Sequence, residues 1–300
     1  MFFLKNKAKV AVHNGNFHAD DLFSIATLSL YLGYMPKIIR TRDLKIINEA
    51  DYVVDVGEEY NPSKSKFDHH QNGGAGKREN GIPYAAFGLV WKEFGEKITG
   101  LKLSQEIIDK KLTQVIDADD NAFDICKDFT CDARPYTISN YVFLKNSVCE
   151  EKDRDQVFGK LVIWALDILK AEISITNRLV NDIDKVEAIY SSTQDKRLIV
   201  LDKNYNWDKV LSEHSEPLFV VKPSPDIKAW KVYCVRVKGE AFKCRADLPT
   251  SWGSKKDDEL AKATGVPDAI YCHHSKYMAI AKSKEGALKL AELAIKNTEK

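Results

Sequence analysis

Two short segments near the N-terminus combine histidines with aspartates. Residues 13–21 read HNGNFHADD and residues 67–70 read FDHH, so together they hold four of the seven histidines in the chain. Mixed imidazole and carboxylate ligands suit Mn²⁺, Zn²⁺ or Fe²⁺, whereas Ca²⁺ prefers oxygen ligands alone. These residue types therefore indicate a transition-metal site.

The elements around these segments predict how the side chains could meet. Residues 9–57 alternate β-type and helical runs in the order β-α-β-α-β, which predicts a parallel sheet with helices packed on it. Ligands of such sheets gather at the carboxyl ends of the strands. The candidate ligands that lie at or just after the strand ends are His13, His18, Asp20, Asp55 and His69.

Single parts of this pattern have simpler explanations. Asp20 and Asp21 would stabilise a helix N-terminus through the helix dipole, and a lone histidine at a helix start is commonly a cap or a surface residue. Asp55 is harder to explain away, because an unpaired charge at the end of a buried apolar strand is costly. The joint pattern is more specific, and two bridged metal ions about 3.5–4 Å apart are the usual device for cleaving phosphoesters.

The length of 300 residues favours two domains. We expect an α/β protein with a catalytic domain at residues 1–155, built on a mainly parallel sheet flanked by helices. A long helical segment at residues 156–192 then connects it to a smaller C-terminal α+β domain at residues 193–300. The glycine-rich segment QNGGAGKRENG at residues 71–81 reads as a loop over or beside the site.

Composition excludes several classes of protein. The net charge of +1 excludes a uniformly basic nucleic-acid coat but allows a local basic groove. The six cysteines form no C-x-x-C pair, so a zinc ribbon or thioredoxin-type site is not expected, and the thiols should be free in a cytoplasmic setting. We find no signal peptide and no apolar run near the roughly 20 residues that span a bilayer, so no membrane association is expected.

The order of these motifs resembles the DHH phosphoesterase superfamily. The resemblance is closest to the melanocyte proliferating gene one family of predicted metal-dependent hydrolases, some of which are described as RNA exonucleases that act from the 3′ end. It covers nearly the whole chain. The segments that carry it are HNGNFHADD, YVVDVGEEY, KFDHHQ, VIDADDN, FKCRADLP and SWGSKKDDELAKATGVPDAIYCHH.

The resemblance implies a two-metal centre, with Mn²⁺ as the metal and Mg²⁺ or Zn²⁺ as alternatives. One ion would be held by His13, His18 and Asp55. The other would be held by Asp20, Asp55, His69 and one aspartate of VIDADDN, for which we favour Asp117 over Asp120.

Two neighbours of His69 take the catalytic roles in this interpretation. Asp68 and His70 would orient His69 or face the substrate, and one of them would assist proton transfer or position the leaving group.

The C-terminal domain is implied to clamp the substrate through Arg245, Lys256 and His273. The alternatives are a surface salt bridge for Arg245 and an exposed or core position for His273. Relatives tend to carry arginines near Gly253 and Lys256, and a lysine offers a point charge in place of a bidentate fork. This departure leaves the substrate preference open. Trp252 is a further candidate for stacking on a base.

The expected function is that of a metal-dependent phosphodiesterase. The most specific form is a 3′–5′ exonuclease on single-stranded RNA or short oligonucleotides that uses a water activated by two metal ions. Two alternatives stay open: a hydrolase of a small phosphorylated metabolite such as pyrophosphate or a dinucleotide, and a non-catalytic metal-stabilised binding protein. The sequence leaves the oligomeric state undetermined.

Overall fold

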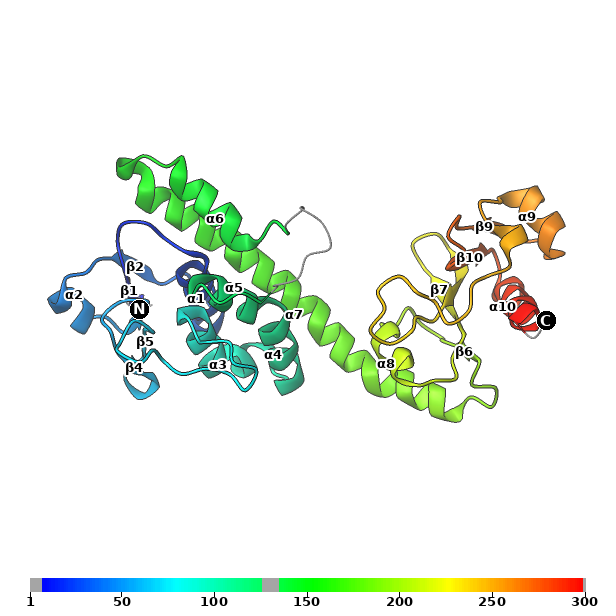
Figure 1. The fold of residues 1–300 in the computed structure, drawn as a ribbon, viewed down its shortest axis with the longest axis horizontal. Coiled ribbons are helices and arrows are strands. Elements are labelled where there is room, and N and C mark those ends of the chain that lie inside the picture. The colour runs from blue at the N-terminus through cyan, green and yellow to red at the C-terminus, as the bar shows by residue number, and fades with distance from the viewer. Residues whose placement is uncertain (1–6, 126–134, 299–300) are drawn as a thin grey trace, which may run out of the picture. The chain divides into compact units, whose positions relative to one another are not determined.

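The computed structural model describes residues 7–125 and 135–298, and this part of the chain forms two compact units that divide between Asn177 and Arg178 (Figure 1). The expected fold class is confirmed, since a mainly parallel sheet flanked by helices precedes a long helix and a smaller α+β unit. None of the helices in the described ranges combines the length and apolar character needed to cross a membrane. Cys126 and Cys131, two of the expected free thiols, lie outside the described residues, while Cys149, Cys234, Cys244 and Cys272 are free.

The sheet of the first unit contains five strands. In sheet order these are β2 (Lys37–Arg40), β1 (Lys9–Val12), β3 (Tyr52–Val54), β5 (Lys66–Phe67) and β4 (Tyr60–Asn61). Only β4 runs antiparallel to its neighbour, so the carboxyl ends of β1, β3 and β5 lie at one edge. Val10 and Val54 are fully buried, as expected for strands covered on both faces.

The helices of the first unit cover this sheet and surround its functional edge. They are α1 (Ala19–Leu32), α2 (Leu44–Asn48), α3 (Ala86–Thr99), α4 (Lys102–Ile108), α5 (Gln114–Asp120) and α6 (Ile138–Ser147). The expected helix stop at Gly33 is confirmed, because this residue adopts the left-handed conformation at φ 76°. Phe23 of α1 packs on Phe87 of α3 with ring centroids 5.3 Å apart, which joins the two most buried helices.

A π-helical segment, Asp109–Thr113, joins α4 to α5 without a break. The sequence SQEIIDKKLTQVIDADD predicts this stretch as one helix, and the π turn is the part of it that the sequence does not reveal. A π turn inserts one extra residue into the helical repeat and therefore rotates everything that follows.

The long helix α7 (Arg154–Ser192) contains 39 residues. Its N-terminal part buries Phe158, Val162 and Ala165 in the core of the first unit. Its C-terminal part buries Val186 and Tyr190 in a core of the second unit. Both cores therefore include apolar residues of this one helix.

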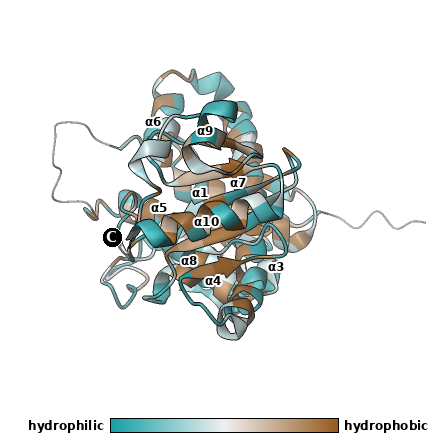
Figure 2. Ribbon diagram, turned by 90° about the vertical axis from the view of Figure 1, so that its right-hand side faces the viewer, coloured by the Kyte–Doolittle hydropathy of each residue, from teal (hydrophilic) through white to brown (hydrophobic). Residues whose placement is uncertain are grey.

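The sheet of the second unit also has five strands. In sheet order these are β6 (Leu198–Val200), β7 (Phe219–Ser224), β8 (Ala229–Cys234), β10 (Met278–Ala281) and β9 (Ala269–Cys272). All neighbouring pairs are antiparallel except β6 and β7. The helices α9 (Asp257–Thr264) and α10 (Lys284–Thr298) share one core with this sheet, and α8 (Asp208–Glu213) belongs to the other. In Figure 2, α10 carries both hydrophilic and hydrophobic residues, as expected for a helix with one buried face.

Candidate metal centre

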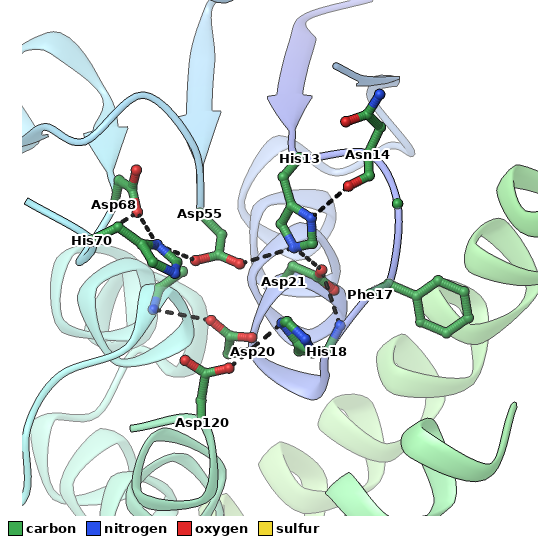
Figure 3. Close-up of polar contacts among 12 residues, drawn as sticks. His13, Asn14, Phe17, His18, Asp20, Asp21, Asp55, Asp68, His70 and Asp120 are labelled. Carbon is green, nitrogen blue, oxygen red and sulfur yellow. Dashed lines mark hydrogen bonds and ion pairs between the residues drawn. The ribbon is translucent and has the colours of Figure 1, made fainter. Parts of the chain in front are cut away.

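Three strand ends and two helices bring the histidines and aspartates together (Figure 3). His13 directly follows β1, Asp55 directly follows β3, and the Asp68–His70 segment follows β5. The side chains of His13 and Asp55 are 4% and 2% exposed, respectively, so the cluster is buried at its centre. The expected position at the carboxyl edge of the sheet is where these residues lie.

Asp55 lies at the middle of the cluster. Its Oδ2 is 3.2 Å from His13 Nε2, and its Oδ1 is 3.3 Å from His69 Nε2. The backbone of Asp55 is left-handed, with φ 53°, a conformation that non-glycine residues adopt at a cost of about 1–3 kcal/mol. The strained turn after β3 thus places the carboxylate between two imidazoles.

The first turn of α1 contributes two fully buried carboxylates. His18 caps the helix, and its backbone N–H donates to Asp21 Oδ2 over 3.2 Å. The same Asp21 oxygen is 3.1 Å from His13 Nε2. Asp20 accepts a hydrogen bond from Ala86 N at 3.3 Å, and its Oδ2 is 4.0 Å from His69 Nε2. Sequence analysis explained Asp21 only by the helix dipole, but its burial beside His13 makes it a member of the cluster.

The loop before α1 is fixed by its neighbours. Arg40 donates a hydrogen bond to Gly15 O at 2.7 Å, and Phe17 N donates to Asn146 Oδ1 on α6 at 3.3 Å. The guanidinium of Arg40 also lies 4.7 Å from the ring centroid of Phe158. These contacts hold the loop that presents His18.

The last turn of α5 contributes Asp120 rather than the favoured Asp117. Asp120 Oδ2 is 3.1 Å from His69 Nε2, and Oδ1 is 3.7 Å from His18 Nδ1. Asp117 lies 2.9 Å from the Arg78 guanidinium and accepts a hydrogen bond from Gly88 N at 2.9 Å. This geometry favours Asp120 over Asp117 as a ligand, and the π turn before α5 affects which aspartate faces His69.

Asp117 belongs to a packed ionic network. Arg78 donates two hydrogen bonds to Asp109, at 3.1 Å and 2.8 Å, and its guanidinium lies 4.2 Å from the ring centroid of Tyr84. A Cβ on Gly88 would lie 1.8 Å from Asp117 Oδ2, so only glycine fits this position. Burial raises the pKa of Asp117, and the positive charge of Arg78 opposes that shift. Arg78 anchors the glycine-rich loop through this network.

Asp68 organises the DHH turn. Its carboxylate accepts backbone hydrogen bonds from Glu58 at 2.6 Å, His69 at 2.7 Å and His70 at 3.2 Å. His70 Nδ1 also lies 2.8 Å from Asp68 Oδ1 and 3.4 Å from Asp55 Oδ1. Asp68 is 1% exposed, whereas the His70 side chain is 57% exposed. Asp68 thus positions His70, whose ring reaches the surface.

The histidines at the centre are held as cations by the surrounding carboxylates. Burial alone would lower the pKa of His13, but Asp21 and Asp55 raise it to about 10. Burial likewise opposes the shift at His69, where Asp120 and Asp55 raise the pKa to about 10.

The carboxylates differ sharply from one another. Burial raises the pKa of Asp20 well above its ordinary value, and the charges of Asp120, Asp55 and Asp21 raise it further. Burial would also raise the pKa of Asp55, but its contacts with His13 and His69 lower it overall. The surroundings of Asp20 therefore disfavour its ionised form, which a bound cation would stabilise.

The donor set fits divalent metal ions. Three groups have ligand atoms that all lie within 4.8 Å of one another: His13, His18, Asp21 and Asp55; Asp55, His69 and His70; and His18, Asp20 and Asp120. The close contacts among these ligand atoms lack hydrogen-bond geometry. Within the described residues, Asp20 Oδ1, both Asp55 carboxylate oxygens and His69 Nε2 are buried without a hydrogen-bond partner. Buried polar atoms of native proteins are normally paired, so these atoms are those expected to bind metal.

A cavity of about 760 Å³ adjoins the cluster. His18, His69, His70 and Asp120 form its polar wall, and Phe143 of α6 forms part of the opposite lining. The Phe143 side chain is 72% exposed, which is unusual for a large apolar residue. The cavity gives a ligand access to the histidines and presents an aromatic surface beside them.

Comparison with known proteins identifies the family of the chain. The family model named for MYG1 exonucleases, whose description reads "Uncharacterised protein family (UPF0160)", matches residues 9–295. The chain belongs to the MYG1 family. The match covers both units, including every candidate ligand.

Several relatives share this length. A MYG1 protein of Schizosaccharomyces pombe is 27% identical and the alignment covers 97% of this chain and 98% of the relative. A MYG1 exonuclease of Rattus norvegicus is 28% identical over 96% of this chain and 84% of the relative. The structure of a pGpG-specific phosphodiesterase from Vibrio aligns over 98% of this chain and 99% of the Vibrio chain, at 12% sequence identity and a TM-score of 0.32.

In the second unit of this MYG1 family member, Arg245 has a structural environment. Its guanidinium donates hydrogen bonds to Pro217 O at 3.0 Å, Ser212 O at 2.7 Å and Leu211 O at 3.4 Å. The Arg245 guanidinium is thus engaged with three backbone carbonyl oxygens. These contacts explain its position through packing and not through a surface salt bridge.

The other expected substrate residues are more accessible. Lys256 is exposed at the start of α9 and pairs through its backbone with Tyr271, and His273 accepts a hydrogen bond from Ser275 N at 3.1 Å. The ring of His273 lies 4.5 Å from the ring centroid of Tyr277. Trp252 is 4% exposed within the core and so is not available to stack on a base.

Proposed function

We propose that this MYG1 family member is a metal-dependent phosphodiesterase, and specifically a 3′–5′ exonuclease on single-stranded RNA or short oligonucleotides. The observation that carries this proposal is the convergence of His13, Asp55 and His69 with the buried carboxylates of Asp20 and Asp21 beside one pocket. Relatives named MYG1 exonuclease match nearly the whole chain, and their names support a nuclease activity.

The residues would divide between two ions. His13, His18, Asp21 and Asp55 suit one ion, and Asp20, Asp55, His69 and Asp120 suit the other, with Asp55 shared. Two divalent ions would supply a nucleophile from water at neutral pH and would offset negative charge on the phosphate oxygens. Mn²⁺ is our proposed metal, because mixed imidazole and carboxylate ligands suit it.

His70 is placed to handle the proton of the leaving group. Its hydrogen bond with Asp68 raises the pKa of His70, which favours the protonated form of the ring. Because Nδ1 faces Asp68, the other ring nitrogen, Nε2, is left for the cavity. We assign His70 as the group that gives this proton to the departing oxygen, and Asp68 as the residue that positions it.

A side-by-side assay tests the proposal. Wild-type protein and His69→Ala are incubated with Mn²⁺ and a labelled oligoribonucleotide, the dinucleotide pApA, or pyrophosphate. We expect cleavage of the oligonucleotide from its 3′ end by the wild type and none by His69→Ala, with both proteins equally folded by circular dichroism. Wild-type turnover in the variant would remove the proposal.

The substrate panel separates the remaining alternatives. Pyrophosphate or pApA cleaved far faster than the oligonucleotide would identify a hydrolase of small phosphorylated metabolites. One tightly held zinc ion per chain, with no phosphoester hydrolysed, would identify a metal-stabilised binding protein. Localisation in the cytoplasm remains part of the proposal and is tested by fractionating cells that express the tagged chain.

A further inference from the structure

The second unit contains a polar cavity whose lining residues differ in type from those of the metal centre. Its volume is about 430 Å³, within the range of roughly 300–1,000 Å³ that is usual for small-ligand sites. Its residues come from α7, from α8 and the loop before it, from β7, from β8 and the segment after it, and from the turn before β10. Four of them are aromatic: Tyr205, Trp207, Tyr233 and Tyr277.

The aromatic rings form part of a fixed wall. Trp207 and Tyr233 lie with ring centroids 5.9 Å apart at 46°, and Trp207 is 8% exposed. The loop that carries Tyr205 is held by Asn206, whose backbone and amide nitrogens donate to Asp182 Oδ2 at 3.0 Å and 2.8 Å. Rings of this kind are platforms on which nucleobases stack, at about 1–3 kcal/mol per base.

The charges in the lining are unbalanced. Lys209, Lys222 and Arg236 face a single carboxylate, Asp208, which lies 3.8 Å from the guanidinium of Arg236. The cavity therefore favours an anion. Arg236 and Lys209 are exposed at its rim, whereas Lys222 is partly buried on β7.

Of these cations, Lys222 gives the strongest indication of an anion site. It lies directly across from Lys231 in the β7–β8 pair, an arrangement of like charges that destabilises a sheet. Within the described residues, no carboxylate lies within 4.0 Å of its Nζ; Asp182 is the nearest acidic group that acts on it, and burial together with Lys231 lowers the pKa of Lys222. Nζ lies 5.6 Å from the Tyr233 ring centroid and 3.4 Å from Tyr205 O. A bound anion would relieve this repulsion.

We propose that this cavity binds a nucleoside monophosphate, with the base against Tyr205 and the phosphate at Lys222. The choice of a nucleotide over another aromatic anion rests on the proposed phosphodiesterase function. The expectation that the ligand is an aromatic anion rests only on the cations and rings of the lining and is independent of that function. The nucleotide is either free, as a product or an effector, or is one unit of an oligonucleotide. The shared chemistry is an aromatic base joined to a phosphate.

Calorimetric titration of the intact chain with AMP, in the presence of a chelator of divalent metals, tests the proposal. We expect saturable binding with a dissociation constant below about 1 mM and adenosine binding about tenfold more weakly, because adenosine lacks the charged contacts. No heat of binding with AMP up to about 5 mM, or equal affinity for adenosine, overturns the proposal.

Variants locate the ligand. Lys222→Met keeps the apolar stem and should weaken AMP binding about tenfold, while the matched control Lys262→Met on α9 should leave it unchanged. Tyr205→Ala should weaken AMP binding about fivefold or more, and Tyr205→Phe should restore it, because stacking needs the ring and not the hydroxyl. Unchanged affinity in both Lys222→Met and Tyr205→Ala excludes the cavity.

Two further arms separate this site from the metal centre. His69→Ala should keep full AMP affinity, and loss of binding in that variant would place the ligand beside the histidines and overturn the proposal. pApA that binds more tightly than AMP identifies the site as part of an oligonucleotide path, whereas equal or weaker binding identifies a site for the free nucleotide. AMP binding in a wild type that hydrolyses no phosphoester leaves this site standing and removes only the proposed phosphodiesterase function.

Discussion

The cavities of the two units carry opposite kinds of unsatisfied charge. The cavity beside the metal centre is lined by histidines and by Asp119 and Asp120, and within the described residues its lining includes no lysine or arginine. The cavity of the second unit is lined by three cations, one aspartate and four aromatic rings. The first cavity therefore favours a bound cation, and the second cavity favours a bound anion that has an aromatic part.

The two cavities also differ in how their polar groups are held. In the first unit, Asp55 has a strained backbone, and Asp20 is fully buried among like charges. In the cavity of the second unit, Lys222 lies on the regular strand β7 opposite Lys231, and the exposed Lys209 and Arg236 lie at the rim. Buried charge concentrates where chemistry is expected, as in other active sites.

The largest expected effect comes from removing one buried charge of the metal centre. Asp20→Asn should reduce phosphodiesterase activity by about 10³-fold, because several kcal/mol of charge stabilisation would be lost with the metal. The same change should make the metal-free protein more stable by about 1 kcal/mol, because the folded state raises the pKa of Asp20 and so destabilises its charged form at neutral pH. Activity and thermal unfolding in a chelator measure the two effects.

Adding Mn²⁺ to the same unfolding experiment makes the test more specific. Mn²⁺ at about a hundredfold excess over its dissociation constant should stabilise the wild type by about 2.7 kcal/mol and should leave Asp20→Asn nearly unchanged. A variant that is less stable than the wild type without metal would show that the carboxylate cluster is a structural network, and the contrast between the two cavities would fail.

The next largest effect separates the two aspartates of α5. Asp120→Asn should weaken Mn²⁺ binding and activity by about 100-fold with little change in stability, because its carboxylate faces His69 and His18. Asp117→Asn should instead destabilise the protein by about 1–3 kcal/mol, because it breaks a buried pair with Arg78. The exposed neighbour Asp119→Asn is the matched control for metal binding, and titration with Mn²⁺ followed by calorimetry reads out all three. The opposite pattern would return Asp117 to the ligand set.

How far the sequence predicts the metal centre depends on what carries each residue. His13, Asp55 and His69 follow strands whose parallel order could be inferred from the alternation of β-type and helical runs, and strand ends converge by topology. Asp120 depends on the rotation of a helix that contains a π turn, which the pattern of apolar residues does not reveal. Asp21 was not predicted as a ligand, because its position in the first turn of α1 already explained an acidic residue there.

The second unit was less predictable for a related reason. Its alternating strands and α9 and α10 are clear from the sequence, whereas α8, β10 and the cavity they help to form are not. The cavity is assembled from residues between positions 179 and 277, and none of them belongs to a motif that suggests chemistry. Arg245 was expected to bind substrate by resemblance and Trp252 to stack on a base by its residue type, whereas the structure shows carbonyl contacts for the first and burial for the second.

A smaller effect tests that assignment of Arg245. Arg245→Met keeps the apolar stem but removes hydrogen bonds to Ser212 O and Pro217 O, and should lower the free energy of unfolding by about 2–3 kcal/mol. Mn²⁺ binding at the metal centre should be unaffected, since that site belongs to the first unit. Urea unfolding and Mn²⁺ titration provide the two measurements. A variant of unchanged stability that loses activity would instead make Arg245 a substrate ligand.

The smallest expected effect compares the two cavities in a single measurement, the dependence of binding on salt. Charges near the surface are screened over a distance of about 10 Å at 0.1 M ionic strength, whereas buried charges are screened much less. Raising the salt concentration from about 50 mM to 200 mM should therefore weaken AMP binding about twofold, because Lys209 and Arg236 are exposed at the rim of that cavity. Mn²⁺ binding should change less, because Asp20 and Asp55 are buried.

Calorimetric titrations of each ligand at both salt concentrations measure the two dependences, with potassium chloride as the salt to avoid a competing divalent ion. AMP affinity that is independent of salt would mean that the rim cations contribute nothing and that Lys222 and the rings alone hold the ligand. Mn²⁺ affinity that falls more steeply than AMP affinity would mean that the metal binds at the exposed carboxylates near Asp119 and not in the buried cluster. The relative size of the two slopes therefore tests whether burial, and not only the sign of the charge, distinguishes the two cavities.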